Sequence, residues 1–182
     1  MAATSLEHHQ GTQAASPPTG SRLPVATSND TLWEMVLDLT GSLVTQLLRQ
    51  QCRSGNGVPI STILPNHMVA AMELTGDVTA RFILSVSERQ QKTIATSMLP
   101  EGSLENEPQE VIEDTVLELV NVICGNVVAE ASRRGVTLEI LPPYTVRVPS
   151  TGLPTPDLCD AFTVPLQLED GETLELILLI ER

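Results

Sequence analysis

Aromatic and basic residues are both scarce in this chain. Its 182 residues include one Trp, one Tyr and two Phe, and 10 Lys and Arg stand against 23 Asp and Glu, for a formal net charge of -13. A surface of this charge repels phosphate backbones and anionic lipid headgroups, and so few aromatic rings offer little for base stacking. We therefore expect neither nucleic acid nor a membrane among its partners.

Cysteine and long apolar runs are also limited. Cys52, Cys124 and Cys159 lie far apart, without the close Cys or His spacing of zinc sites. His8 and His9 lack a third ligand, so we expect no metal or cofactor held by this chain. No segment approaches about 18 consecutive apolar residues, and the N-terminus has no apolar signal-peptide core. We expect reduced thiols and a cytoplasmic location.

The first 28 residues are rich in Ala, Ser, Thr, Pro and Gln and contain little that a core would bury. This composition predicts a disordered tail. Residues 29–182 are enough for one domain with a core of useful size.

Hydrophobic periodicity in that domain predicts three helices. Residues 30–52 carry apolar side chains at helical spacing, with Thr31 and Glu34 as a capping box. Ser87 and Gln90 predict the start of a short helix that runs to about residue 98. A third and longer helix is predicted over residues 106–135.

Alternating and apolar runs predict an antiparallel sheet. Residues 68–74 and 78–86 form one hairpin pattern and residues 161–168 and 173–180 a second, with Pro165 indicating an edge or bulge. Shorter strands are predicted at residues 59–64, 137–141 and 144–148, with a loop over 149–156. The fold class is therefore α+β, with two long helices and one short helix on a largely antiparallel sheet.

The long helix, NEPQEVIEDTVLELVNVICGNVVAEASRRG, has well-marked ends and two different faces. Asn106 is a favourable N-cap with Pro108 in the first turn, and Gly135 is a typical stop. At about 100° per residue its apolar residues fall on one broad arc. We expect the following residues of that arc to be buried: Ile112, Val116, Leu119, Val120, Ile123, Cys124, Val127 and Ala131.

The opposite side of the same helix carries one stripe of polar and small residues. Asp114, Glu118, Asn121 and Gly125 are spaced by four, three and four positions, so they lie along one line. Polar residues on an amphipathic helix are most often only a solvated surface. The spacing alone therefore does not establish a site.

A wider pattern around this stripe resembles the active-site helix of the CheC/CheX/FliY family of chemotaxis phosphatases. The pattern is D-x3-E-x2-N at Asp114, Glu118 and Asn121, the run ELVNVICGN over residues 118–126, and the Pro142-Pro143 pair. The resemblance covers most of the chain after the tail. It implies a phosphatase that stimulates dephosphorylation of a phosphorylated CheY-type response regulator, with the Mg²⁺ held by the regulator.

The resemblance also implies roles for the stripe. Asn121 would orient the attacking water and Glu118 would pair with the regulator's active-site lysine, which makes these two the expected catalytic residues. Gly125 would let the regulator seat closely and Asp114 would contact it. Asp114 has an alternative interpretation as a first-turn acid favoured by the helix dipole.

The two long helices also resemble each other. TLWEMVLDLTGSLV, from residue 31, and TVLELVNVICGNVV, from residue 115, match at five of fourteen positions, and each is followed by a hairpin. This predicts an internal duplication with pseudo-two-fold symmetry. Glu34 corresponds to Glu118, but Leu37 stands where the second helix has Asn121, so one site is expected, as in CheX.

Two other interpretations remain open. The chain could be a non-catalytic module that binds a response regulator or resembles the motor switch, or a structural subunit. The apolar run LELILLI, within residues 173–180, needs cover on both faces or a partner. Because CheX-like proteins form dimers through their sheets, we expect a homodimer through sheet edges.

Overall fold

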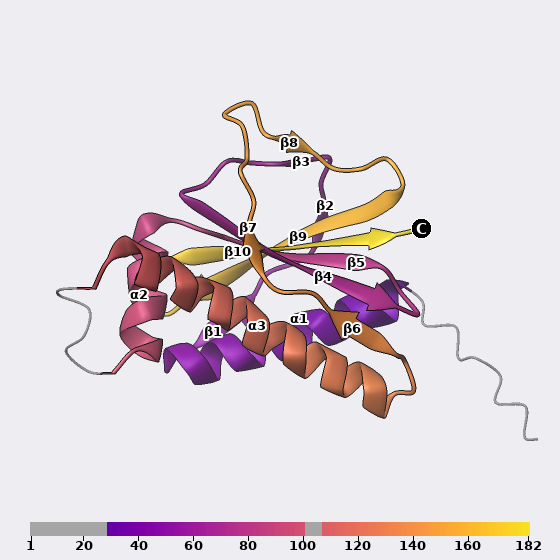
Figure 1. The fold of residues 1–182 in the computed structure, drawn as a ribbon, viewed down its shortest axis with the longest axis horizontal. Coiled ribbons are helices and arrows are strands. Elements are labelled where there is room, and N and C mark those ends of the chain that lie inside the picture. The colour runs from indigo at the N-terminus through magenta and orange to yellow at the C-terminus, as the bar shows by residue number, and fades with distance from the viewer. Residues whose placement is uncertain (1–28, 101–106) are drawn as a thin grey trace, which may run out of the picture.

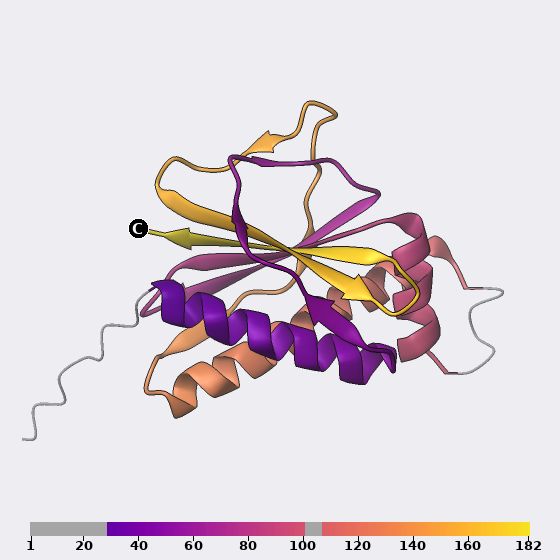
Figure 2. The same ribbon diagram turned by 180° about the vertical axis from the view of Figure 1, so that it is seen from behind.

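The computed structural model describes residues 29–100 and 107–182, and the predicted tail lies outside these residues (Figure 1). Within them the chain forms three helices, α1 (Asn29–Leu48), α2 (Glu88–Met98) and α3 (Gln109–Arg133). Figures 1 and 2 show all three along one side of the sheet. None of the described helices is long and apolar enough to cross a membrane.

The main sheet is antiparallel throughout and runs in the order β1-β9-β10-β5-β4-β6. Two short strands extend it, since β2 pairs with β9 and β7 pairs with β4, while β3 and β8 form a separate ladder. This arrangement confirms the predicted α+β class. The strands span β1 (Cys52–Ser54), β2 (Val58–Pro59), β3 (Thr62–Ile63), β4 (Met68–Gly76), β5 (Ala80–Val86), β6 (Leu138–Ile140), β7 (Tyr144–Thr145), β8 (Leu153–Pro154), β9 (Cys159–Leu168) and β10 (Thr173–Glu181).

Strand β10 shows how both faces of the sheet are covered. Leu176 and Leu178 belong to the large core under the helices, whereas Ile177 and Leu179 belong to a smaller cluster on the other face with Ile63 of β3. β10 lies between β9 and β5, so the apolar run that needed cover receives it from this chain. A homodimer through sheet edges stays a prediction, and β10 provides no edge for it.

The first predicted helix is wrong at both ends. α1 already includes Asn29, so Thr31 lies inside the helix and cannot be its N-cap. The helix ends at Leu48, Arg49 has a positive φ of 54°, and Cys52–Ser54 becomes strand β1. The reason is long-range pairing of β1 with residues 166–168 of β9. The predicted strand over residues 59–64 is likewise divided into β2 and β3.

The long helix begins two residues later than predicted, with its N-cap at position 108 instead of 106. Gln109 is its first residue, and Pro108 is the N-cap and makes no side-chain capping bond. Asn106, the predicted cap, lies outside the described residues. At the other end, the Gly135 amide donates to the Ser132 carbonyl and the Val136 amide to the Ala131 carbonyl, which is a Schellman motif that confirms the predicted stop.

Pro165 interrupts the outer ladder as predicted, although β9 is not an edge strand. Its carbonyl accepts from the Gly55 amide at 2.8 Å, so its missing N–H faces the same outer side. There the chain leaves the ladder between β1, which ends at Ser54, and β2, which begins at Val58. The proline therefore removes no hydrogen bond from the pairing of β9 with β10.

The strand order has the symmetry expected of a duplication. Exchanging β1 with β6, β9 with β4 and β10 with β5 reproduces the order in reverse, and β2 and β7 occupy matching places beside β9 and β4. The same exchange relates β3 to β8, which pair with each other. The two halves are interlocked, because each supplies an outer strand to the other's hairpin.

Candidate functional site

The sequence of α3 separates it into a buried and an open side. Every residue of the predicted apolar arc is buried, from Ile112 to Ala131, and Thr115 is buried with them. The Thr115 hydroxyl donates to the Val111 carbonyl at 2.7 Å, so its polar atom is satisfied within the helix. Burial of this arc leaves the residues of the opposite stripe facing outward.

The structure brings the predicted site residues together on that side. Asp114 and Glu118 are exposed, and Asn121 and Gly125 are half-buried. Asn121 Nδ2 donates to Glu118 Oε2 at 3.2 Å, so the carboxamide and the carboxylate are neighbours across one helical turn. The stripe thus presents an acceptor-rich acid beside a neutral group that can both donate and accept.

Gly125 leaves open space in the middle of the helix. Apart from its chain neighbours and the adjoining helix backbone, a methyl group added there would have no atom within 4 Å. A methyl group added at Gly41 of α1 would lie 3.1 Å from Ser54 Oγ. Packing within this chain therefore explains a small residue at Gly41 but does not require one at Gly125. A glycine that its own fold does not need is consistent with close approach of something else.

The first-half counterpart of the stripe is not an equivalent site. Glu34 is exposed on α1, as Glu118 is on α3. Leu37, at the position of Asn121, is partly buried and packs against the main core. The α1 position thus offers a carboxylate with no carboxamide beside it, as the sequence predicts.

Cys124 lies beside the stripe in sequence but belongs to the core. Its side chain is fully buried, and burial raises the pKa of its thiol to about 12. A thiol with so high a pKa is not ionised near neutral pH and is a poor nucleophile.

Asn126, which follows Gly125, donates to the Val122 carbonyl at 2.8 Å and so turns back onto its own helix.

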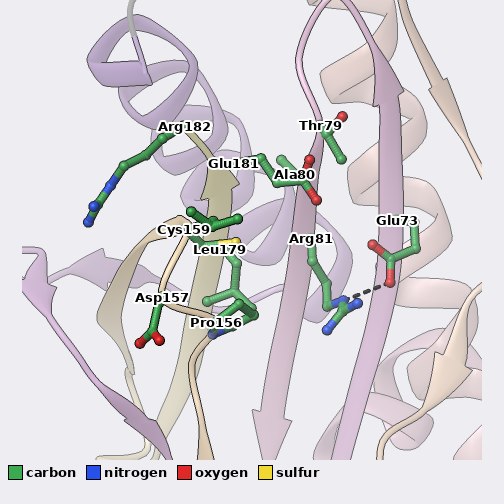
Figure 3. Close-up of a pocket in the computed structure, with 11 residues that line it drawn as sticks. Glu73, Thr79, Ala80, Arg81, Pro156, Asp157, Cys159, Leu179, Glu181 and Arg182 are labelled. Carbon is green, nitrogen blue, oxygen red and sulfur yellow. Dashed lines mark hydrogen bonds and ion pairs between the residues drawn. The ribbon is translucent and has the colours of Figure 1, made fainter.

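A cavity of about 430 Å³ lies far from the stripe, on the sheet face away from the helices (Figure 3). Glu73 accepts there from Arg81 Nε at 2.6 Å and from the Tyr144 hydroxyl at 2.5 Å. Sequence analysis singled out none of these residues, although charged residues inside apolar strands could have indicated a polar site there.

Among the described residues, no group of three or more His, Cys, Asp or Glu is placed to hold a metal ion.

Comparison with known proteins decides the family. The model of the family described as "Chemotaxis phosphatase CheX" matches residues 68–167, more than half of the 182 residues. The chain belongs to the CheX family. No curated protein matches the chain as a sequence relative.

Solved CheX structures share the fold at low sequence identity. One is the CheX–CheY–BeF3–Mg²⁺ complex from Borrelia burgdorferi, with a TM-score of 0.68 and 21% identity over 83% of this chain and 98% of that one. CheX from Desulfovibrio desulfuricans gives 0.67 and 16% over 82% and 99%. FliY from Thermotoga maritima gives 0.60 and 15% over 84% and 88%. Both the CheX and the FliY branches of the predicted family are therefore structural neighbours.

Proposed function

We propose that this chain stimulates hydrolysis of the aspartyl phosphate on a CheY-type response regulator, in chemotaxis or a related two-component pathway. Membership of the CheX family supports the phosphatase role, and the Borrelia burgdorferi neighbour is a CheX in complex with CheY. The observation that carries the proposal for this chain is the outward pairing of Glu118 with Asn121 beside the open position of Gly125.

The chemistry suits a carboxamide. Hydrolysis of a phosphoryl group needs little covalent help but depends on a water held in line with the breaking bond. Asn121 stays neutral, so it holds that water as acceptor and donor without competing for phosphorus as a charged nucleophile. In this proposal the regulator supplies the Mg²⁺ and the phosphoaspartate, and this chain adds no cofactor.

The carboxylate serves docking. Glu118 is exposed and ready to pair with a lysine of the regulator, which would fix how the regulator sits on α3. Asp114 lies one turn further toward the N-terminus and would contact the regulator's surface. Gly125 would let that surface approach the helix backbone.

Replacing Asn121 tests the assignment. We expect Asn121→Ala to lower the stimulated rate of dephosphorylation by about 100-fold or more, because the water loses its positioning group. Binding to the phosphorylated regulator should persist, whereas Glu118→Ala should weaken both binding and rate. The measurement is decay of the ³²P-labelled regulator with and without each variant.

Glu34→Ala is the matched control, since it removes the corresponding exposed glutamate of α1 and should leave the rate unchanged. A wild-type rate with Asn121→Ala would overturn the assignment of this residue. The other interpretation, a binding module without catalysis, predicts that the unaltered protein binds the regulator and releases no phosphate.

The dimer is a separate proposal. The outer strands β1 and β6 are the ends of the main sheet, so we expect a homodimer to use one of these edges. Light scattering that gives the mass of one chain at all concentrations would contradict it.

A further inference from the structure

The hydrogen bond between Asn121 and Glu118 bears on how the carboxamide is oriented before any partner arrives. Asn121 Nδ2 lies 3.2 Å from Glu118 Oε2. A carboxylate only accepts hydrogen bonds, so it attracts the NH2 end of a carboxamide and repels the oxygen end. The two possible flips of the Asn121 amide are therefore not equivalent in this chain.

This preference sets the direction of the other end of the group. A carboxamide is planar, with its nitrogen and oxygen on opposite sides of the same carbon. When Nδ2 points toward Glu118, one turn back along α3, Oδ1 points away from that carboxylate. The next residue of the stripe, Gly125, adds no side chain beside this amide, and apart from its chain neighbours and the adjoining helix backbone no atom lies within 4 Å of where its Cβ would be.

We propose that Glu118 is also a positioning residue, which holds the Asn121 amide with its oxygen turned away from the carboxylate so that a water can donate to that oxygen. The inference rests on the proposed function and deepens it, because it gives Glu118 a role in the chemical step besides docking. The carboxylate has two oxygens, so Oε1 remains available for a lysine while Oε2 holds the amide.

The first half of the chain shows what this arrangement requires. Glu34 is exposed at the same place on α1, yet Leu37 beside it has no polar atom to hold, and the space at Gly41 is bounded by Ser54. The carboxylate, the carboxamide and the open glycine occur together on α3 and not on α1. Glu34 is therefore a matched control for a glutamate without the positioning role.

Two variants of Glu118 separate positioning from docking. Glu118→Gln keeps an oxygen that can accept from Asn121 Nδ2 but removes the charge that a lysine would pair with. Glu118→Ala removes both. Glu118 is on the exposed surface, so the fold should tolerate either change.

Steady-state kinetics on the phosphorylated regulator give the first readout. Glu118→Gln should raise KM while keeping kcat within about 2-fold of the unaltered protein, and Glu118→Ala should raise KM similarly and lower kcat by about 10-fold. Glu34→Ala should change neither. Equal kcat values for Glu118→Gln and Glu118→Ala would overturn the positioning role and leave the proposed function intact.

NMR of the free protein gives a second readout that needs no activity. The side-chain amide pair of Asn121, assigned by its loss in Asn121→Ala, should show one downfield proton that shifts upfield in Glu118→Ala, is partly retained in Glu118→Gln and is unmoved in Glu34→Ala. Identical Asn121 amide signals with and without Glu118 would overturn the inference. If the unaltered protein does not accelerate dephosphorylation, the proposed function fails, and the amide signals still decide whether Glu118 orients Asn121.

Discussion

Polar residues along α3 differ in what they bind. Near the helix start, Gln109 donates to Gln91 of α2 at 3.0 Å, and near its end Glu130 accepts from Arg133 at 2.6 Å and Arg134 at 2.9 Å. The first contact joins α3 to α2, and the other two stay within the last turn of α3 and its C-cap. Glu118 and Asn121, in the middle, have each other as hydrogen-bond partners, which leaves their outer atoms for water or another protein.

Gly125 should be dispensable for folding and needed for activity. Gly125→Ala should leave the free energy of unfolding unchanged or raise it by up to about 1 kcal/mol, because alanine favours the helix and meets no atom there. The added methyl should lower stimulated dephosphorylation by keeping the regulator away from the backbone. Urea denaturation and regulator decay measure the two effects.

Gly135→Ala is the contrasting control on the same helix. Gly135 has a φ of 82°, so alanine there should lower stability by about 1 kcal/mol and leave the site untouched. Full activity in Gly125→Ala would show that the open glycine has no functional role.

Cys124 should make the protein less stable at high pH. Burial raises the pKa of its thiol from 9.0 to about 12, so above pH 9 the unfolded chain loses this proton and the folded chain keeps it. Stability should therefore fall as the pH rises from 9 toward 12, by roughly 1 kcal/mol per pH unit from this group. The urea midpoint should fall more between pH 8.5 and pH 10.5 in the unaltered protein than in Cys124→Ala. An equal fall in both proteins would contradict the raised pKa of Cys124.

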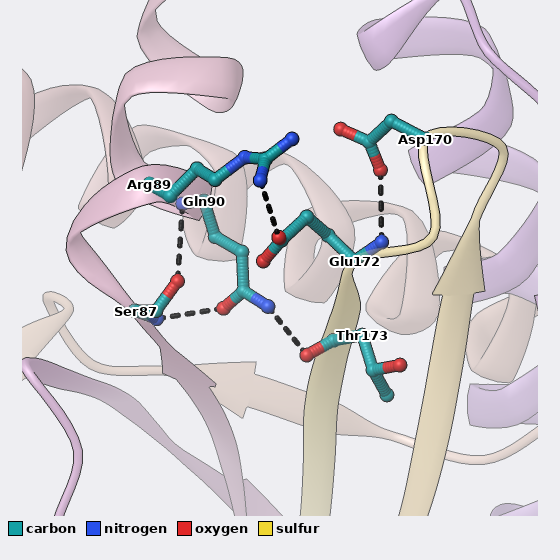
Figure 4. Close-up of polar contacts among 6 residues, drawn as sticks. All are labelled: Ser87, Arg89, Gln90, Asp170, Glu172 and Thr173. Carbon is teal, nitrogen blue, oxygen red and sulfur yellow. Dashed lines mark hydrogen bonds and ion pairs between the residues drawn. The ribbon is translucent and has the colours of Figure 1, made fainter.

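At the scale of elements, α2 is held at its start by a capping box that also reaches the second hairpin (Figure 4). The backbone N–H of Gln90 donates to Ser87 Oγ at 3.2 Å, and the backbone N–H of Ser87 donates to Gln90 Oε1 at 2.6 Å. The same Gln90 side chain donates through Nε2 to the Thr173 carbonyl of β10 at 2.5 Å. One glutamine thus caps the helix and joins it to the other half of the chain.

Replacing Gln90 should lower the free energy of unfolding more than replacing Ser87 or Arg89. We expect Gln90→Ala to lower the free energy of unfolding by about 2 kcal/mol, since a buried group loses a cap bond and a bond to β10. Ser87→Ala should cost about 1 kcal/mol. Arg89→Ala should stay within about 0.5 kcal/mol, because the Arg89 side chain is largely exposed and lies 3.3 Å from Glu172. Urea denaturation measures the free energy of unfolding of each variant. A loss for Gln90→Ala no larger than that for Ser87→Ala or Arg89→Ala would contradict this account.

At the scale of the whole molecule, the two halves cannot be separated without exposing strands. β1 of the first half pairs with β9, β6 of the second half pairs with β4, and β5 and β10 form the central ladder between them. Trp33 of α1 lies 5.4 Å from Phe162 of β9, ring centre to ring centre. The indole therefore reports on contact between the halves.

We expect one cooperative unfolding transition. Because each half completes the other's sheet, the urea transition followed by Trp33 fluorescence should coincide with that followed by far-UV circular dichroism. Fluorescence that changes at a lower urea concentration than the dichroism would show that the halves part before they unfold.

Most of the elements and the whole polar stripe were predictable from sequence. Local patterns, formed by residues close together in the sequence, are visible in the chain itself. They predicted the buried arc of α3, its Gly135 stop, both hairpins and the Ser87 cap. The first helix was predicted too long because residues 52–54 have no strong preference of their own. They become a strand only by pairing with residues 166–168.

The sequence by itself determined which side chains line the outer face of α3, since periodicity places Glu118 and Asn121 on one side of any helix formed there. Tertiary structure alone decided that the space at Gly125 is open while Ser54 bounds the space at Gly41, and that the halves exchange outer strands. The physical reason is range: helix faces follow from neighbouring residues, whereas strand pairing and free space depend on segments far apart in the chain.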